Sequence, residues 1–417
     1  MNKKFRIWII NQFACTPDMP GGSRHHEIAK YFVKNGFEVD IFASDFNLSS
    51  RKFLRLNNIE FVKKELNEGV KFFWLKTFPY KKNNWKRYLN LLSFCFSFLI
   101  FNFYKILTFS LKNYIPDLII ASSPQILVSF CGLIIAKVFK IPFILEVRDL
   151  WPQVLIDLGG HDPKNILIKI LSLIEYLLYR EAESVVVLAK GSKNYVKAKG
   201  AKNIIWLPNG PDLEKFKYIS NYSNSENFNY ANPFTLIYAG AHGKANDLEN
   251  VIKAASILKS YPIKFQFIGD GPEKKDLIIK AKNLKNIEFK NSVSKKIIPE
   301  LLAKSNAILI SLGDVKLFQY GVSPNKLYDA YALAKPVIST LKGSINEEIK
   351  KNNLGLVCDP NDPYALADII KKMYMLPEIE RKKMGLNGRR IAESTYSRNR
   401  INNVFLKLIR NILKENV

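Results

Sequence analysis

The chain has 417 residues, of which 47% are hydrophobic and 24% charged, and this composition excludes a disordered protein. At this length we expect two domains rather than a single core. The 63 Lys and Arg against 37 Asp and Glu give a formal net charge of +26, which favours a polyanionic partner. No zinc finger, aromatic RNA-binding strand or isolated basic tail accompanies this charge. We therefore expect an anionic membrane surface or a diphosphate as the partner, and no nucleic acid.

The cysteines and histidines give no sign of a metal site or a disulfide framework. The four cysteines lie far apart and lack metal-ligand spacing, which is typical of reduced, mostly buried thiols in a cytosolic protein. The four histidines form no cluster with them, so we expect no structural zinc. The cysteines are Cys15, Cys95, Cys131 and Cys358.

The first half of the chain alternates short β-rich runs with helical patterns, which predicts a parallel α/β sheet. Its first strand is predicted at Phe5–Asn11. Because Arg6 interrupts this apolar run and no small-residue cleavage site follows, we do not interpret it as a signal peptide. A loop rich in Pro and Gly and a helix from about Ser23 to Asn35 come next. Further strands are predicted at Phe37–Ala43, Asp117–Ala121, Pro142–Val147, Ser184–Leu188 and Ile204–Leu207.

The segment 88–104 carries no charge and is rich in Phe and Leu. It is slightly short for a transmembrane helix, which needs about 20 apolar residues. Asn90, Ser93 and Ser97 fall on one helical face of the segment and form a weak polar stripe. Two interpretations stay open: a buried helix of the first domain, or an interfacial helix whose basic flank meets anionic lipid. The basic residues of that flank are Lys81, Lys82, Lys86 and Arg87.

Residues 218–232 break the pattern, because eight of these fifteen residues are Asn or Ser, as is typical of a linker. A second series of strands follows, at Phe234–Ala239, Ile263–Ile268, Ile287–Phe289, Ala307–Ile310, Pro336–Thr340 and Gly355–Cys358. We expect two Rossmann-like domains that face each other across a cleft, with ligands at the carboxyl ends of the strands. The predicted parts are a first domain at 1–212, a linker at 213–233, a second domain at 234–394 and a C-terminal helix at 395–417.

The strongest local pattern runs from Gly321 to Ile338 and contains Ser-Pro-Asn-Lys. Pro324 is expected in the first turn of a helix. The free N–H groups and the helix dipole at such a start suit a diphosphate, and Lys326 adds positive charge. Asp329 lies about one turn further on, where a carboxylate accepts hydrogen bonds from ribose hydroxyls. Taken alone, the pattern also fits a capped helix with solvated charges.

This stretch resembles the donor-binding segment of the retaining family-4 glycosyltransferases, which have the GT-B fold. In that family a glutamate is followed, after seven residues, by a second glutamate and then by a small-residue run ending Gly-Lys-Pro-Val. Here Asp329 takes the second acidic position, and 334–337 stand for the ending, whereas Gly321 replaces the first glutamate. The Ser-Pro-Asn-Lys version is similar to the subgroup that builds O-antigen and capsule repeats.

Two loops of the first half add to the resemblance. Gly21 and Gly22 lie in a loop like the family's N-terminal Gly-rich loop, whose backbone approaches the donor phosphates, as residues without Cβ allow. The run Glu146–Pro152 resembles the active-site loop, with Arg148 where the usual histidine stands. The resemblance places Arg148 beside the donor sugar or phosphate and Asp149 near the acceptor hydroxyl. A structural Arg-Asp ion pair is the alternative.

The second half carries two further matches. The loop 238–248 resembles the one that holds the diphosphate in this family, with Lys244 as its obvious cation and Asn246 near the usual lysine position. Val293 lies where backbone groups usually meet the nucleobase. In GT-B enzymes the last helix, here from Tyr396 onward, crosses back onto the first domain.

The resemblance implies a retaining glycosyltransferase of the hexosyl or N-acetylhexosaminyl type. Its donor is expected to be a nucleotide-diphosphate sugar, UDP-linked, and its acceptor a lipid-diphosphate-linked or other glycan in bacterial surface polysaccharide synthesis. No metal or other cofactor is expected, and the location expected is the cytoplasm, peripheral at the inner face of the cell membrane. Arg148 and Asp149 are the expected catalytic residues. The expected donor-binding residues are Gly21, Gly22, Lys244, Val293, Gly321, Ser323, Asn325, Lys326 and Asp329.

Two other classes of function stay open. A dinucleotide-dependent oxidoreductase would share the α/β pattern, but no complete G-x-G-x-x-G follows the first strand. A non-catalytic, membrane-associated binding protein would account for the segment 88–104 and for the charge. Release of UDP or GDP from a donor separates the glycosyltransferase from both.

Overall fold

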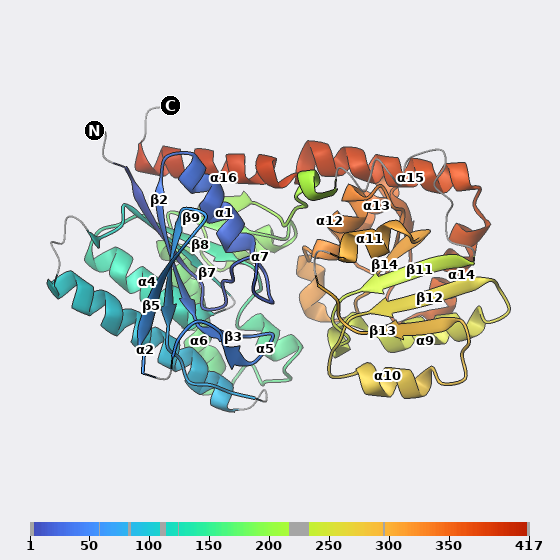
Figure 1. Ribbon diagram of the computed structural model, residues 1–417, viewed down its shortest axis with the longest axis horizontal. Coiled ribbons are helices and arrows are strands. Elements are labelled where there is room, and N and C mark those ends of the chain that lie inside the picture. Colours follow the sequence, from blue (N-terminus) through green and yellow to red (C-terminus); the bar gives the residue numbers. More distant parts are fainter. Residues whose placement is uncertain are drawn as a thin grey trace. The chain divides into compact units, whose positions relative to one another are not determined.

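The computed structural model describes residues 4–57, 59–81, 85–108, 114–123, 125–216, 233–294 and 297–414 (Figure 1). Its contacts divide the chain into two compact units. Unit 1 comprises Met1–Leu188, Ser192–Leu207 and Asn402–Val417, and unit 2 comprises Ala189–Gly191 and Pro208–Ile401.

Unit 1 is built on an eight-stranded sheet with the strand order β10-β9-β8-β7-β1-β2-β6-β5. All neighbouring strands are parallel except the β5–β6 pair, so the sheet is doubly wound with one antiparallel edge. β1 lies between β2 and β7, and the chain adds strands first on one side of β1 and then on the other. We call this reversal of the strand order the change of winding. The strands are β1 (Arg6–Ile10), β2 (Glu38–Ser44), β5 (Val62–Asn67), β6 (Val70–Leu75), β7 (Leu118–Ser122), β8 (Phe143–Val147), β9 (Ser184–Val187) and β10 (Ile204–Trp206).

Helices cover this sheet, and the strands between them are buried on both faces, as parallel strands require. The helices of the unit are α1 (Arg24–Lys34), α2 (Trp85–Thr108), α4 (Ile126–Val138), α5 (Gln153–Asp157), α6 (Ile166–Glu181) and α7 (Ser192–Ala198). The last helix of the chain, α16 (Arg398–Leu413), belongs to unit 1 from Asn402 onward. Its Phe405 ring meets the Phe32 ring of α1 edge-on at 5.5 Å, which confirms that the C-terminal helix packs on the first domain.

Unit 2 is built on a six-stranded sheet in which all five neighbouring pairs are parallel, in the order β13-β12-β11-β14-β15-β16. The change of winding falls between β11 and β14. The strands are β11 (Phe234–Ala239), β12 (Ile263–Ile268), β13 (Ile287–Lys290), β14 (Ala307–Ile310), β15 (Val337–Ser339) and β16 (Gly355–Val357). The helices are α9 (Leu248–Ile257), α10 (Lys274–Lys280), α11 (Ile298–Ala303), α12 (Asn325–Ala332), α13 (Ser344–Lys351), α14 (Pro363–Met375) and α15 (Glu378–Ile391).

The twelve strands predicted from the sequence are all present, several with ends that differ by one or two residues, and the structure contains further elements that were not predicted. The β5–β6 hairpin was not predicted, nor was the short antiparallel pair β3 (Phe46–Asn47) and β4 (Lys52–Phe53). The helix α12 begins at Asn325, so Pro324 is its N-cap and not a residue of its first turn. Most of the predicted linker lies outside the described residues.

The segment 88–104 lies within α2, and its two faces differ. Phe94 and Phe98 are fully buried, whereas Phe96 is 66% exposed. The segment is therefore a helix of the domain that also presents a second apolar face outward. By length and hydropathy α2 is the one helix among the described residues that would be able to cross a membrane.

Candidate functional site

The loops at the carboxyl ends of the strands carry the predicted site residues in both units. In unit 1, Gly21 and Gly22 follow β1, and Arg148 and Asp149 follow β8. In unit 2, the remaining seven follow β11, β13 and β14 or lie in the helix after β14. In doubly wound sheets, ligands bind at this edge beside the change of winding.

Gly21 adopts φ +135°, and a Cβ built on it would lie 2.7 Å from the Sγ of Cys15. That sulfur is buried, so a side chain at this position would need both a strained backbone and a displaced neighbour. The Asn47 side chain also holds this loop, because its Nδ2 donates to the Pro20 carbonyl at 2.7 Å. Gly22 has open space around its Cβ position. The backbone before α1 is therefore held in place at Pro20 and Gly21, and the two glycines place no side chain on its surface.

Glu146, at the end of β8, carries a fully buried carboxylate. Its oxygens accept from Arg24 Nε at 2.9 Å, His25 Nε2 at 2.7 Å and Ser122 Oγ at 2.9 Å. Burial opposes ionisation of Glu146, but Arg24, His25 and Arg148 outweigh it and hold its pKa well below the ordinary value. The Glu146 cluster thus ties α1 to β7 and β8, and sequence reasoning gave it no role.

Burial also lowers the pKa of His25, so its ring is neutral at pH 7 and donates its Nε2–H to Glu146. Its Nδ1 then accepts from the Asn11 amide at 3.2 Å. Asn11 directly follows β1, so this chain of hydrogen bonds joins the ends of β1 and β8 through α1.

Arg148 and Asp149 have exposed side chains on the loop after β8. Ser123 holds their backbone: the Arg148 N–H donates to Ser123 Oγ, and that hydroxyl donates to the Asp149 carbonyl. No ion pair joins the two side chains within the part of the chain that the structure describes. Although the Asp149 side chain reaches solvent, the surrounding protein atoms partly desolvate its carboxyl and raise its pKa, while the Arg148 charge opposes that shift.

In unit 2, the loop after β11 lies directly against the turn after β12. The Gly240 N–H donates to the Ile268 carbonyl, and the His242 N–H donates to the Asp270 carbonyl, both at 2.9 Å. A Cβ on Gly269, where φ is +148°, would lie 1.9 Å from the Gly240 oxygen. Glycine is therefore required at 269 for the two backbones to meet.

The loop after β11 is also joined to the loop after β14. Ser311 Oγ donates to the Asn246 carbonyl at 2.8 Å, and the Gly313 N–H donates to the Ala245 carbonyl at 3.0 Å. The two loops that flank the change of winding therefore form one connected surface, and α12 begins beside it.

Lys326, in the first turn of α12, places its ammonium over this surface. Its Nζ lies 4.0 Å from the centre of the Tyr238 ring and 3.4 Å from Asn246 Oδ1. Burial lowers the pKa of Lys326 to about 7. No carboxylate pairs with this ammonium among the residues that the structure describes. Desolvation of this kind makes Lys326 a candidate for binding an anionic group of a ligand.

Ser323 and Gly321 lie in the short segment that leads into α12. Ser323 Oγ accepts from the Asn209 N–H at 3.0 Å and lies 2.9 Å from the Tyr328 hydroxyl. Gly321 adopts φ +87°, and a Cβ there would come within 3.3 Å of Ala189 and Gly191. The hydroxyl of Ser323 thus holds the turn at Asn209, a function that the sequence did not indicate.

The remaining predicted residues lie around these loops. Asn325 is exposed at the first position of α12, and Asp329 is half-buried one turn later. Lys244 is exposed in the 3-10 turn Lys244–Asn246, and Val293 is exposed after β13. The structure thus brings Lys326 to Asn246, whereas Lys244 extends into solvent from the same loop.

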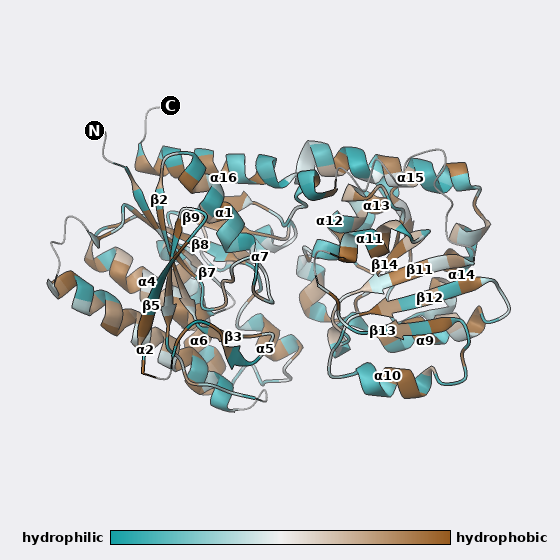
Figure 2. Cartoon of the chain, in the orientation of Figure 1, coloured by the Kyte–Doolittle hydropathy of each residue, from teal (hydrophilic) through white to brown (hydrophobic). Residues whose placement is uncertain are grey.

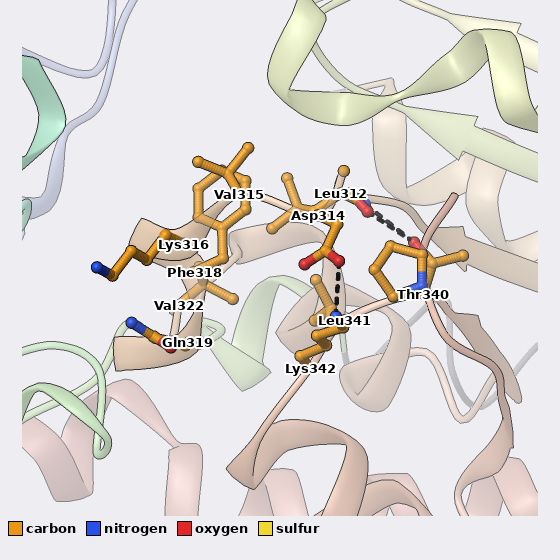
Figure 3. Close-up of a pocket in the computed structure, with 12 residues that line it drawn as sticks. Leu312, Asp314, Val315, Lys316, Phe318, Gln319, Val322, Thr340, Leu341 and Lys342 are labelled. Atoms are coloured by element: carbon orange, nitrogen blue, oxygen red, sulfur yellow. Dashed lines mark hydrogen bonds and ion pairs between the residues drawn. The ribbon is translucent and has the colours of Figure 1, made fainter. Parts of the chain in front are cut away.

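A small pocket of about 100 Å³ lies at the ends of β14 and β15, beside the turn Lys316–Tyr320 (Figure 3). Asp314 pairs with Lys342 at 2.8 Å across it, and Thr340 Oγ1 accepts from the Leu312 N–H at 3.1 Å. In Figure 3, Lys316 points away from that ion pair. Within the described residues, no group of three His, Cys, Asp or Glu is placed to hold a metal ion.

Known proteins match this chain in sequence over most of its length. Residues 222–391 match the model of the family described as glycosyl transferases group 1. A protein of Escherichia coli K12 named as the colanic acid biosynthesis glycosyl transferase WcaI is 23% identical over 347 residues, which are 80% of this chain and 82% of that protein. A protein of Pseudomonas aeruginosa named as the glycosyltransferase WbjE is 25% identical over 285 residues, 66% and 69% of the two chains.

Solved structures resemble the whole chain. Sucrose-phosphate synthase from Thermosynechococcus elongatus has a TM-score of 0.75 at 15% identity and covers 99% of this chain and 100% of its own. HepE of Anabaena, solved in complex with UDP-glucose, has a TM-score of 0.67 at 15% identity and covers 98% and 100%. The chain therefore has the GT-B fold, and residues 222–391 are similar to the family of glycosyl transferases group 1.

Proposed function

We propose that this protein is a retaining glycosyltransferase that takes its sugar from a nucleotide-diphosphate donor, UDP-linked. The observation that supports it best is the desolvated ammonium of Lys326 beside Asn246, which has no carboxylate partner among the described residues. A donor diphosphate supplies the missing negative charge at the start of α12, where free N–H groups also point outward. Structures of a similar fold that contain UDP and UDP-glucose favour a UDP donor.

The acceptor that we propose is a lipid-diphosphate-linked or other glycan in the synthesis of a bacterial surface polysaccharide. The names of the two bacterial relatives and the Ser-Pro-Asn-Lys pattern support this choice. The sugar transferred is a hexose or an N-acetylated amino sugar. The location that we propose is the inner face of the cell membrane, and the net charge of +26 supports it.

The proposed chemistry needs no metal, because positive groups of the protein stabilise the leaving diphosphate. Lys326 and Lys244 supply charge in unit 2, and the backbone at Gly21 and Gly22 admits the phosphates closely. Arg148 acts on the donor sugar or phosphate. Asp149 orients the acceptor hydroxyl, whose proton passes to the departing phosphate as the new glycosidic bond forms on the same face of the sugar.

A panel of nucleotide sugars tests this function without knowledge of the acceptor. The correct donor should raise the melting temperature, because a ligand that binds only the folded state stabilises it. The same donor should yield free UDP when an acceptor extract is added. Protection by a nicotinamide dinucleotide, or binding of a donor that is never turned over, would favour the oxidoreductase or the non-catalytic binding protein instead.

A further inference from the structure

The helix α2 presents an unusual outer surface to its surroundings. Large apolar side chains recur at intervals of three or four residues along its exposed side. Figure 2 shows hydrophobic residues along the length of this helix. Phe96 and Phe103 are each 66% exposed, and Leu107 is 70% exposed. The exposed stripe also includes Leu92, Ile100 and Tyr104. Exposing an apolar surface of this extent to water is unfavourable. Its presence therefore indicates a partner that is itself apolar.

Three uncharged polar residues of α2, Asn90, Ser97 and Asn102, lie on the opposite, inward side. Asn90 is fully buried, donates from Nδ2 to the Phe78 carbonyl at 2.6 Å, and accepts from Gln12 Nε2 at 2.8 Å. Ser97 Oγ donates to the Lys76 carbonyl at 2.7 Å, and Asn102 Oδ1 accepts from the Tyr114 hydroxyl at 2.8 Å. A helix surrounded by water has the reverse arrangement, so the outer side of α2 is adapted to a non-aqueous medium.

Two further helices extend this apolar surface. The helix α4 contacts both α2 and α6 and exposes Ile134 and Val138. The helix α6 exposes Ile166, Ile170 and Leu173 on one side, while its Glu175 points inward and is buried. Between α2 and α4 lies an almost wholly apolar groove of about 410 Å³. Its walls include Leu99, Ile100, Phe103, Ile106, Ile134 and Val138.

The charges along α2 have one sign, whereas at the end of α6 Glu181 pairs with Lys137 of α4. Residues 70–145 contain ten Lys and Arg but a single acidic residue, Asp117. On α2 itself, Lys86 and Arg87 lie in the first turn and Lys105 in the last, and the helix has no Asp or Glu. Of the other basic residues that precede the apolar run, Lys81 is exposed and Lys82 lies outside the described residues. A cationic border around an apolar centre matches an anionic bilayer surface.

We propose that the outer sides of α2, α4 and α6 form a lipid-binding face that docks on an anionic bilayer, with α2 lying parallel to the membrane plane. The groove between α2 and α4 takes a hydrocarbon chain of a membrane lipid. This proposal rests on the membrane location given under Proposed function, but it is independent of the donor chemistry. The inward hydrogen bonds of Asn90, Ser97 and Asn102 exclude a spanning helix, because insertion would leave these groups without partners. A second copy of this chain is disfavoured, since two equally cationic surfaces repel each other.

The test compares two double variants that remove equally exposed apolar side chains. Phe96→Gln with Phe103→Gln alters the lipid-binding face, whereas Ile279→Gln with Ile379→Gln removes side chains that are 70% and 69% exposed in unit 2. Vesicles of phosphatidylcholine containing a quarter phosphatidylglycerol are floated with each protein. The wild type and the unit 2 variant should float, whereas the lipid-binding face variant should partition less by about tenfold per ring. All three proteins should keep the same melting temperature and the same protection by UDP.

A phosphatidylcholine with a photoactivatable acyl chain, added to the same vesicles, tests the groove directly. Crosslinks should form in peptides of α2 and α4 and should disappear when Ile134→Gln and Val138→Gln narrow and polarise the groove. Equal flotation of all variants, or crosslinks elsewhere only, would overturn the proposal. Concentration-dependent dimers that the Phe96 and Phe103 changes dissolve would assign this surface to a second copy. Loss of UDP protection with flotation intact would instead refute the proposed function.

Discussion

Replacing Lys326 by Met should weaken donor binding and change its dependence on pH. In the free protein the Lys326 ammonium is desolvated against Tyr238, and its pKa is about 7, below the ordinary 10.5. The donor diphosphate favours the charged form of Lys326. Above about pH 7, donor binding is therefore accompanied by the uptake of a proton on this side chain. The affinity of the wild type should therefore fall about tenfold per pH unit above that value, because ever less of the free protein carries the required charge.

The magnitude follows from the contact that is lost. A hydrogen bond to a charged group contributes about 1.5–3 kcal/mol, so Lys326→Met should raise the dissociation constant about tenfold to a hundredfold at pH 7. Calorimetric titration with the nucleotide sugar from pH 6 to 9 measures both effects. Lys326→Arg serves as a control, since its guanidinium stays charged and should remove the slope. A slope that persists in Lys326→Met would refute the assignment of the proton to this side chain.

Four further predictions follow from the site and the core. Asp329→Ala should weaken donor binding by about 1.5–3 kcal/mol in the same titration, because its carboxylate is assigned to the ribose hydroxyls. EDTA should leave wild-type activity unchanged, and activity that is lost and then returns with Mg²⁺ would contradict the metal-free mechanism. Gly269→Ala should destabilise the protein by about 1–3 kcal/mol in urea unfolding, since its Cβ would meet the Gly240 oxygen; Gly243→Ala, with open space around its Cβ, should not. Burial lowers the pKa of Lys335 to about 7, so the unfolded state binds more protons between about pH 7 and 10 and stability rises with pH there; Lys335→Met should reduce that rise.

The sequence predicted β11, β12 and β14 at the residues where the structure has them, because β11 and β14 are short, mainly apolar buried runs and β12 alternates apolar and polar residues. It did not predict β5, whose residues Val-Lys-Lys-Glu-Leu-Asn include no continuous apolar run. That edge strand is defined by its antiparallel pairing with β6, which is a tertiary interaction.

The same distinction holds at the candidate site. The local pattern around α12 predicts Lys326 as a cation for phosphate, and this role stays a prediction. The pattern did not indicate that Asn246, eighty residues earlier, contacts its ammonium, or that Asn209 engages the hydroxyl of Ser323. These contacts join segments that are far apart in the sequence, and single-residue chemistry carries no information about which segments the fold brings together.

Unit 1 is completed only by the last residues of the chain, from Asn402 onward. During synthesis the ribosome therefore releases the whole of unit 2 before Phe405 is available to cover Phe32. Until α16 has been synthesised, the nascent first domain exposes the apolar side of α1 that α16 later covers. A stop codon directly after Ile401 would leave a complete second domain and a first domain without the part of α16 that packs on it.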